Sequence, residues 1–207
     1  MGRLIDLSLP LFDGMPRYPT DPPTVLRQAK SIEHDRTRVT EVSFGSHVGT
    51  HVDVPSHVLA DGKGLDQMDL SSFFGRAVKL RLDRFAEYDL TGMGFDGVLL
   101  ETGWGEYYGD PRKYHGVARP AIPLSLADVL LKKGLRFFGC DLPSADKSGS
   151  VEKVIHARFL SRDVVIYENL TNLDHLPEAV VFAFFGLPLN FRGIDGSPVR
   201  AIAILED

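Results

Sequence analysis

The sequence predicts a fold of the α/β or α+β class, with a large mixed sheet that can curl into a barrel and a few helices. Short runs of β-branched and aromatic residues recur along most of the 207-residue chain, whereas two segments have clear helix boundaries. The 43% hydrophobic content over this length is enough for one sizeable core. We therefore expect a single domain covering residues 1–207.

The strands are predicted from residue type and from alternation along the chain. A proline-rich loop over 10–23 comes first, because its five prolines fix φ and remove backbone donors. Residues 37–44 then alternate and are rich in β-branched side chains, as in a strand. Further strand candidates are the segments 77–82, 97–101, 137–141, 164–168, 179–185 and 199–205. The longest apolar run, 179–185, falls well short of the ~20 residues that cross a bilayer, so no membrane span is expected.

Two helices are predicted from their capping residues. The first covers 125–133, with Ser125 as its N-cap and Gly134 as its stop. The second covers 151–160, with Ser150 as its cap. On the first helix, three apolar residues are expected to share one buried face: Leu126, Val129 and Leu130.

Charge and cysteine content exclude several classes of protein. The net charge of −5 argues against a nucleic-acid binder, which would present a basic face. The lone Cys140 rules out an internal disulfide, and its apolar setting predicts a buried strand end rather than a nucleophile. The N-terminus has no apolar signal core, so we expect a cytoplasmic protein.

Three of the seven histidines lie within eleven residues, together with one aspartate. Counted from His47, the offsets of His51, Asp53 and His57 are four, six and ten, all of them even. Even offsets place side chains on one face of an extended segment, whereas on a helix the aspartate would point away from the first two histidines. Three valines alternate on the opposite face, as a buried strand requires: Val48, Val52 and Val54.

A straight strand would spread these four polar side chains over about 33 Å, which is too far for one ion to collect them. The chain must therefore bend between His47 and His57. Gly49 and Pro55 are the positions where it can, because glycine reaches backbone angles closed to other residues and proline cannot donate within a ladder.

Imidazoles and a carboxylate on one face favour zinc, manganese or iron(II). Three protein ligands leave a position for water, whose pKa a divalent metal lowers toward ~7. His57 then suits general acid–base work and need not be a ligand. This combination is typical of the hydrolysis of an amide, ester or lactone.

Further ligands must come from distant sequence. His156 lies in the second helix, and Glu168 ends an apolar strand, where a salt bridge or solvent exposure would explain it equally well.

The segment from His47 to His57 reads His-x-Gly-Thr-His-x-Asp-x-Pro-x-His, and with it the chain resembles the cyclase family of metal-dependent hydrolases. That family includes kynurenine formamidases and isatin hydrolases. The resemblance covers essentially the whole chain. Its supporting matches are Ile5-Asp6-Leu7-Ser8, Asp141-Leu142-Pro143-Ser144-Ala145-Asp146, Glu168-Asn169-Leu170 and Gly196-Ser197-Pro198-Val199-Arg200.

The resemblance implies a swivelling β/β/α fold around a barrel-like sheet, in a homodimer or a larger homo-oligomer. It implies that His57 is the catalytic acid–base, relaying protons between water and the leaving nitrogen. It also implies one or two divalent ions, zinc or manganese, whose ligands share the aspartate: His47, His51, Asp53, His156 and Glu168. The remaining histidines, which are expected to be surface or structural residues, are His34, His115 and His175.

One departure alters the expected pocket. Kynurenine formamidases typically carry Trp-Pro-Gly-Asp in the N-terminal loop, where this chain has Tyr18-Pro19-Thr20-Asp21. Tyr18 can still stack on an aromatic ring, so we predict that it binds substrate.

The predicted reaction is hydrolysis of the C–N bond of a small arylformamide or cyclic amide. N-formylkynurenine, an intermediate of tryptophan catabolism, is the leading substrate implied by the resemblance. The alternative is a lactonase or another ring-opening activity of the same family. A non-catalytic metal-binding protein is a second class of function, against which the retained His57 argues, because binding alone does not need that residue.

Overall fold

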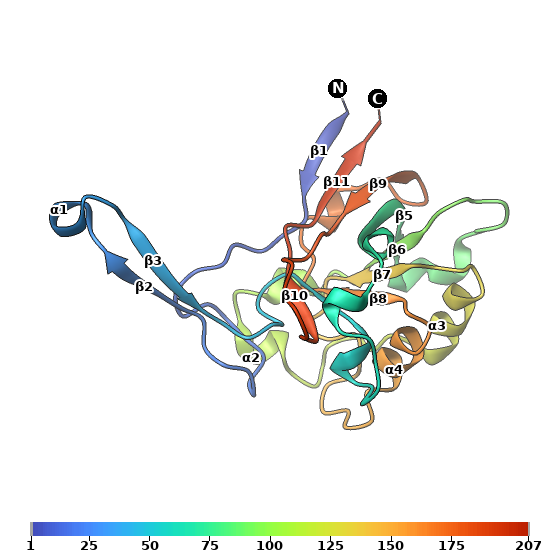
Figure 1. Cartoon of the computed structure of the whole chain (residues 1–207). Coiled ribbons are helices and arrows are strands. Elements are labelled where there is room, and N and C mark those ends of the chain that lie inside the picture. The colour runs from blue at the N-terminus through green and yellow to red at the C-terminus, as the bar shows by residue number, and fades with distance from the viewer. Residues whose placement is uncertain (1, 207) are drawn as a thin grey trace.

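The computed structural model describes residues 2–206, and in it nine strands form one mixed sheet (Figure 1). In spatial order the strands are β1 (Arg3–Asp6), β11 (Ile202–Leu205), β9 (Val181–Phe185), β5 (Phe74–Arg81), β6 (Gly97–Glu101), β7 (Phe137–Cys140), β8 (Val165–Glu168), β4 (His51–Asp53) and β10 (Gly196–Pro198). The neighbours from β5 through β8 run parallel, and the other pairs are antiparallel. The predicted mixed α/β fold class with a curled sheet is therefore confirmed.

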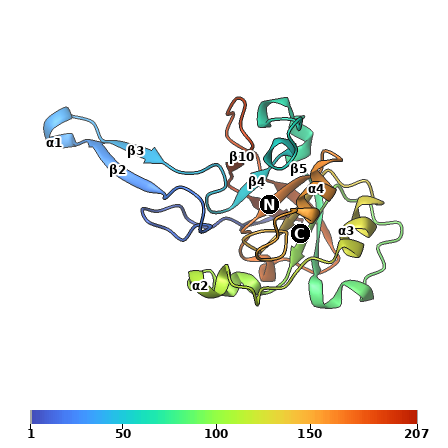
Figure 2. The same cartoon turned by 90° about the horizontal axis from the view of Figure 1, so that it is seen from below.

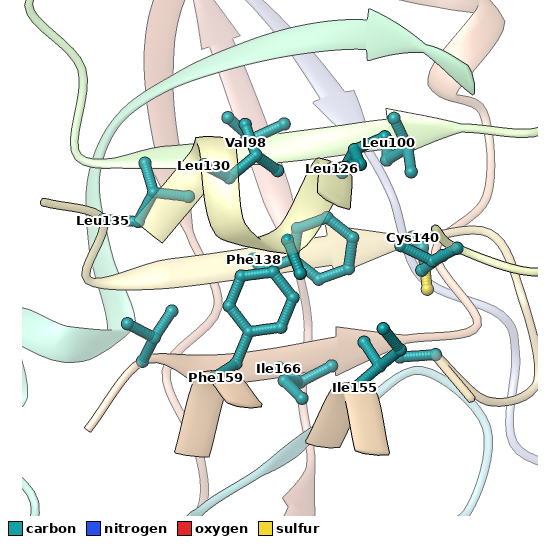
Figure 3. Packing of buried hydrophobic residues seen from close by; sticks show 14 of the residues in the cluster. Val98, Leu100, Leu126, Leu130, Leu135, Phe138, Cys140, Ile155, Phe159 and Ile166 are labelled. Atoms are coloured by element: carbon teal, nitrogen blue, oxygen red, sulfur yellow. The ribbon is translucent and has the colours of Figure 1, made fainter. Parts of the chain in front are cut away.

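Two cores lie on opposite faces of this sheet, because side chains alternate along β6, β7 and β8. On one face the strands pack against α3 (Leu124–Leu131) and α4 (Val154–Leu160), as Figure 3 shows. There the Phe138 ring stacks on the Phe159 ring with 4.7 Å between centroids. On the other face Phe137 packs on Phe184 of β9. Burial on both faces explains why these strands read as continuous apolar runs.

The strand predictions were mostly correct in position. All seven predicted segments contain a strand, and Cys140 is a free thiol at the buried end of β7, as expected. Three strands were not predicted, namely β1, β2 and β10, whereas β4 lies in the extended segment predicted between His47 and His57. One of these, β10, has three residues and is too short to show a period.

The first predicted helix is displaced and exposes one residue that was expected inside. It is α3, which begins after Pro123 and has no side-chain cap, so the assignment of Ser125 as N-cap was wrong. The buried residues are Leu126, Ala127 and Leu130, whereas Val129 is 43% exposed. The small Ala127 packs in the core between helix and sheet, and Val129 lies outside that core.

The second predicted helix begins later than expected. It is α4, whose N-cap position is Lys153 in the left-handed conformation, so the assignment of Ser150 as cap was wrong. The carboxylate of Asp146 performs the capping instead. It accepts hydrogen bonds from the backbone N–H groups of Ile155 at 2.8 Å and His156 at 3.2 Å. A cap supplied from outside the adjacent residues leaves no local sequence signal.

The remaining elements are short. They are the hairpin strands β2 (Val25–Lys30) and β3 (Val39–Ser43), helices α1 (Ile32–Asp35) and α2 (Pro111–Tyr114), and the 3₁₀ turns η1 (Pro55–His57), η2 (Leu65–Gln67), η3 (Leu70–Phe73), η4 (Leu82–Glu87), η5 (Trp104–Tyr107) and η6 (Leu173–His175). The β2–β3 hairpin projects away from the body in both views (Figures 1 and 2). Within residues 2–206, no helix is long and apolar enough to cross a membrane.

Candidate metal and active site

The sheet register brings distant residues of the signature together. Strand β4 lies between β8 and β10, and His51 of β4 stands directly opposite Glu168 of β8. Helix α4, which connects β7 to β8, adds His156. These side chains lie at the base of a pocket of about 220 Å³. The pocket is lined by Pro16, Arg17, Tyr18, Thr20, Asp21, His47, Gly49, His51, His57, Tyr108, Tyr114, His115, Pro143, Ser144, Lys153, His156, Glu168 and Asn169.

The chain bends at both predicted positions. Gly49 has φ +57°, and a Cβ there would meet the Leu11 side chain at 2.6 Å, so both the turn and the close approach require glycine. Pro55 opens the 3₁₀ turn η1, which brings His57 back toward the strand. As a result the rings of His47 and His57, ten residues apart, lie with centroids 4.1 Å apart. The three valines expected to be buried are buried, namely Val48, Val52 and Val54, and the last two belong to one of the two apolar cores.

Asp53 is the centre of the cluster. Its Oδ1 lies 2.7 Å from His47 Nδ1 and 3.3 Å from His51 Nε2, while its Oδ2 lies 3.3 Å from His156 Nε2. The residue is completely buried, and within residues 2–206 its Oδ2 lacks a hydrogen bond of good geometry. A buried carboxylate oxygen with imidazole nitrogens around it and no satisfied bond is the donor arrangement that a divalent cation completes.

Glu168 is the second buried carboxylate of the cluster. Its Oε1 lies 3.1 Å from His156 Nε2 and accepts a 2.5 Å hydrogen bond from the Ala145 N–H, while its Oε2 lies 3.6 Å from His51 Nε2. Solvent exposure therefore does not explain this glutamate, which is buried and contacts two imidazoles. The glutamate faces the same imidazoles as Asp53.

The histidines and the two buried carboxyl groups of the cluster shift one another's pKa values. Burial alone would lower the pKa of His47 and of His51, but neighbouring carboxylates, Asp53 foremost, outweigh it and raise these pKa values to about 9 and about 10. Asp195 contributes at His47 and Glu168 at His51. Burial opposes the charge of Asp53 and Glu168 as well, yet the surrounding imidazoles hold both carboxyl pKa values below their usual range. The buried carboxylates thus require positive charge beside them, from protons or from a cation.

Contacts at Nδ1 orient two of the histidine rings. The carboxylate of Asp146 lies 2.6 Å from His156 Nδ1, and the Gly49 carbonyl lies 2.8 Å from His51 Nδ1. Each contact assigns the proton to Nδ1 and leaves Nε2 toward the two buried carboxylates. Outer partners of this kind orient histidine ligands in metal sites.

The nearest donor atoms form two groups that share one residue. His47, Asp53 and His57 offer ligand atoms within 4.8 Å of one another, and so do His51, Asp53 and Glu168. The donors are imidazoles and carboxylates, which zinc and manganese accept. The chain's own residues therefore fit one or two such ions around a common carboxylate.

The pocket walls are aromatic and polar. Tyr18 meets His115 edge to face, with ring centroids 5.6 Å apart, and the Tyr114 ring also meets that histidine edge to face, at 5.3 Å. His115 was expected to be a surface or structural residue, but it lines the pocket, and burial and the nearby Arg119 lower its pKa. His34 and His175 are exposed, as expected.

Asp195 is a site residue that sequence reasoning missed. Its Oδ2 lies 2.8 Å from His47 Nε2 and 3.3 Å from His57 Nδ1. Hydrogen bonds from these two rings hold the pKa of the Asp195 carboxyl well below its usual range. The residue directly precedes the Gly196 to Arg200 match, which was its one signal. Nothing local indicated contact with histidines that precede it by more than a hundred residues.

Comparison with known proteins agrees with the fold. The sequence profile of the family described as "Putative cyclase" matches residues 5–147. The kynurenine formamidase of Bacillus cytotoxicus is 31% identical over 205 residues, covering 96% of this chain and 95% of its own. That of Bacillus mycoides is 30% identical, with 97% of each chain covered. Isatin hydrolase A from Labrenzia aggregata superposes with a TM-score of 0.86 at 20% identity, covering 99% of this chain and 94% of its own.

A profile match over most of the chain and relatives at this identity are sufficient to assign the family. The signature from His47 to His57 lies inside the matched region. The chain belongs to the cyclase family.

Proposed function

We propose that this protein is a metal-dependent hydrolase that cleaves the C–N bond of a small arylformamide or cyclic amide. One observation carries the proposal. Imidazoles and carboxylates from β4, β8 and α4 converge on the Asp53 carboxylate at the base of a pocket. The kynurenine formamidases that share about 30% identity over nearly the whole chain supply the reaction class.

The ligands that we propose for one or two divalent ions are His47, His51, Asp53, His156 and Glu168. Bound there, a zinc or manganese ion supplies Lewis acidity, which activates water near neutral pH and polarises a carbonyl. The buried carboxylates offset the charge of the ion, and Asp146 holds the His156 ring for binding through Nε2.

His57 is proposed as the acid–base group. It lines the pocket beside His47 and is less buried than the other histidines of the cluster, with a side chain 25% exposed. An imidazole in that place takes a proton from the attacking water and returns it to the departing nitrogen. The amine then leaves neutral, which is the step that an amide makes difficult.

The substrate is proposed to be a planar aromatic amide. Tyr18, Tyr108 and His115 line the pocket, and its volume of about 220 Å³ suits one ring system. N-formylkynurenine is the leading candidate, which would place the enzyme in tryptophan catabolism, because the curated relatives carry the name kynurenine formamidase. Lactones and other cyclic substrates are the runner-up.

The test is a substrate panel combined with elemental analysis of the purified protein. We expect one or two equivalents of zinc or manganese per chain, and turnover of N-formylkynurenine or formanilide that chelation abolishes and added metal restores. Turnover of lactones without any of amides would replace the first candidate by the second. Stoichiometric metal with no turnover of any substrate would favour the non-catalytic class.

We propose a single domain over residues 1–207. The strands nearest the two chain ends, β1 and β11, pair with each other in the same sheet.

A buried, unpaired Cys140 is stable in a reducing compartment, which supports a cytoplasmic location.

Replacing Tyr18 with alanine is expected to raise KM about 10-fold for an aryl substrate, or about 1.4 kcal/mol, with kcat little changed. The reason is that the ring forms a wall of the pocket, where it packs against His115. Steady-state kinetics of Tyr18→Ala and Tyr18→Trp would measure this, and tryptophan should restore KM. Phe12→Ala, in the same loop but outside the pocket lining, is the control. An unchanged KM in Tyr18→Ala would remove the tyrosine from the binding site.

The chain is further proposed to form a homodimer through the β2–β3 hairpin. Every residue of β3 is exposed, although it includes Val39 and Val42, and a lone two-stranded hairpin is marginal in water. We expect light scattering to give a dimer for the wild type and a monomer for the Val39→Asp/Val42→Asp variant. Leu70→Asp, at another exposed apolar residue, is expected to remain dimeric. A wild-type monomer would refute the proposal.

A further inference from the structure

We infer that Asp195 is a positioning residue that holds the His57 ring with its proton on Nδ1, so that Nε2 is the nitrogen that exchanges protons during the reaction. The inference deepens the proposed function and rests on it. The contact that carries it is the 3.3 Å approach of His57 Nδ1 to Asp195 Oδ2. An ionised carboxylate can only accept, so the ring nitrogen that faces it carries the hydrogen.

The Asp195 carboxylate is itself held in place. The Ser46 hydroxyl donates to Oδ1 at 2.9 Å, and the backbone N–H of Val54 donates to the Asp195 carbonyl at 3.2 Å. The next residue, Gly196, pairs with Asp53 across β10 and β4. This pairing ties the loop that carries the aspartate to the strand that carries the proposed ligands.

Close packing behind the carboxylate limits its freedom further. A Cβ on Gly196 would lie 2.8 Å from Cε1 of the His47 ring, so the glycine permits the loop to approach that ring. Asp195 Oδ2 then contacts two imidazoles, with His47 Nε2 at 2.8 Å. One oxygen thus couples the orientation of a proposed ligand to that of the proposed acid–base group.

The alternative is that Asp195 only stabilises the loop before β10. The two roles differ in what an amide would do in the same place. Asparagine has nearly the same shape, and it can still accept from Ser46. Its amide nitrogen, however, can donate to an imidazole and so favour the opposite tautomer. A loop anchor would tolerate this exchange with the chemistry unchanged.

The test is Asp195→Asn, assayed at saturating metal so that any loss of metal affinity does not contribute. We expect kcat for the best panel substrate to fall about 10- to 100-fold, with KM changed less than about threefold. Asp195→Glu, which retains the acceptor, is expected to recover part of kcat. The control is Asp174→Asn, which removes an exposed carboxylate 3.8 Å from His175 and should change neither constant.

A second readout does not depend on activity. Nitrogen-15 NMR of the histidine rings in metal-free protein reports which nitrogen carries the proton. We expect Nδ1–H for His57 in the wild type and a shift toward Nε2–H in Asp195→Asn. An unchanged tautomer, or a kcat within twofold of wild type, would overturn the inference. If the wild type turns over no substrate, the proposed function fails, while the tautomer measurement still tests the contact.

Discussion

Replacing His57 with alanine is expected to lower kcat by about 10²- to 10⁴-fold while the protein keeps its metal content. Without the imidazole, the attacking water and the departing amine nitrogen lose the acid–base group that lies beside the proposed ligand His47. The effect should be larger for formanilide than for an ester of similar shape, because an alkoxide leaves without full protonation. Steady-state kinetics on both substrates, with elemental analysis of each preparation, would measure it.

The metal content of His57→Ala decides whether His57 is an acid–base group or a metal ligand. His57 offers a nitrogen within 4.8 Å of the His47 and Asp53 donor atoms, so it is close enough to be a ligand itself. If His57→Ala loses metal and activity together, the residue is a ligand and the acid–base role is wrong. His175→Ala, which removes an exposed histidine, is expected to change neither property. Activity within tenfold of the wild type in His57→Ala would also reject the role.

The parts of the fold that could be predicted are those in which residue type and burial agree locally. Strands β6, β7 and β8 are covered on both faces, so nearly every side chain had to be apolar, and the segments were recognisable at once. The start of α4 was not predictable, because its cap comes from Asp146, several residues before the helix. The hairpin β2–β3 was half predicted. Both strands are exposed, but β3 is rich in β-branched residues, whereas β2 has one, Val25.

Some residues of the candidate site could likewise be predicted from a local pattern, and others could not. Even offsets along a segment with two bend-permitting residues predicted that His47, His51, Asp53 and His57 converge, and they do. The position of Asp195 depends on the pairing of β10 with β4 across more than a hundred residues of chain. No local pattern encodes that pairing. His115 was set aside for the same reason, because its place in the pocket depends on the fold of the segment around α2.

The exchange of Asp53 for asparagine is expected to have the largest effect of any single substitution. The carboxylate contacts three imidazoles and is buried with them, so its charge is the reason that positive charge is stable there. An amide keeps the shape but is a poor ligand for zinc or manganese and carries no charge. Metal content is expected to fall below about one tenth of wild type, and kcat/KM by about 10⁴-fold or more.

Stability provides a second measurement on the same Asp53→Asn variant. Because an ion bound to the native state alone stabilises it by mass action, chelation should lower the Tm of the wild type. The Tm of Asp53→Asn should not respond to chelation. The matched control is Asp141→Asn, which removes another buried carboxylate, one that accepts from Thr102 and Gly103 instead of facing histidines. That variant should lose stability yet retain metal and the chelation response. If Asp53→Asn binds metal as the wild type does, the shared carboxylate is not a ligand, and the proposed centre must be drawn from the other donors.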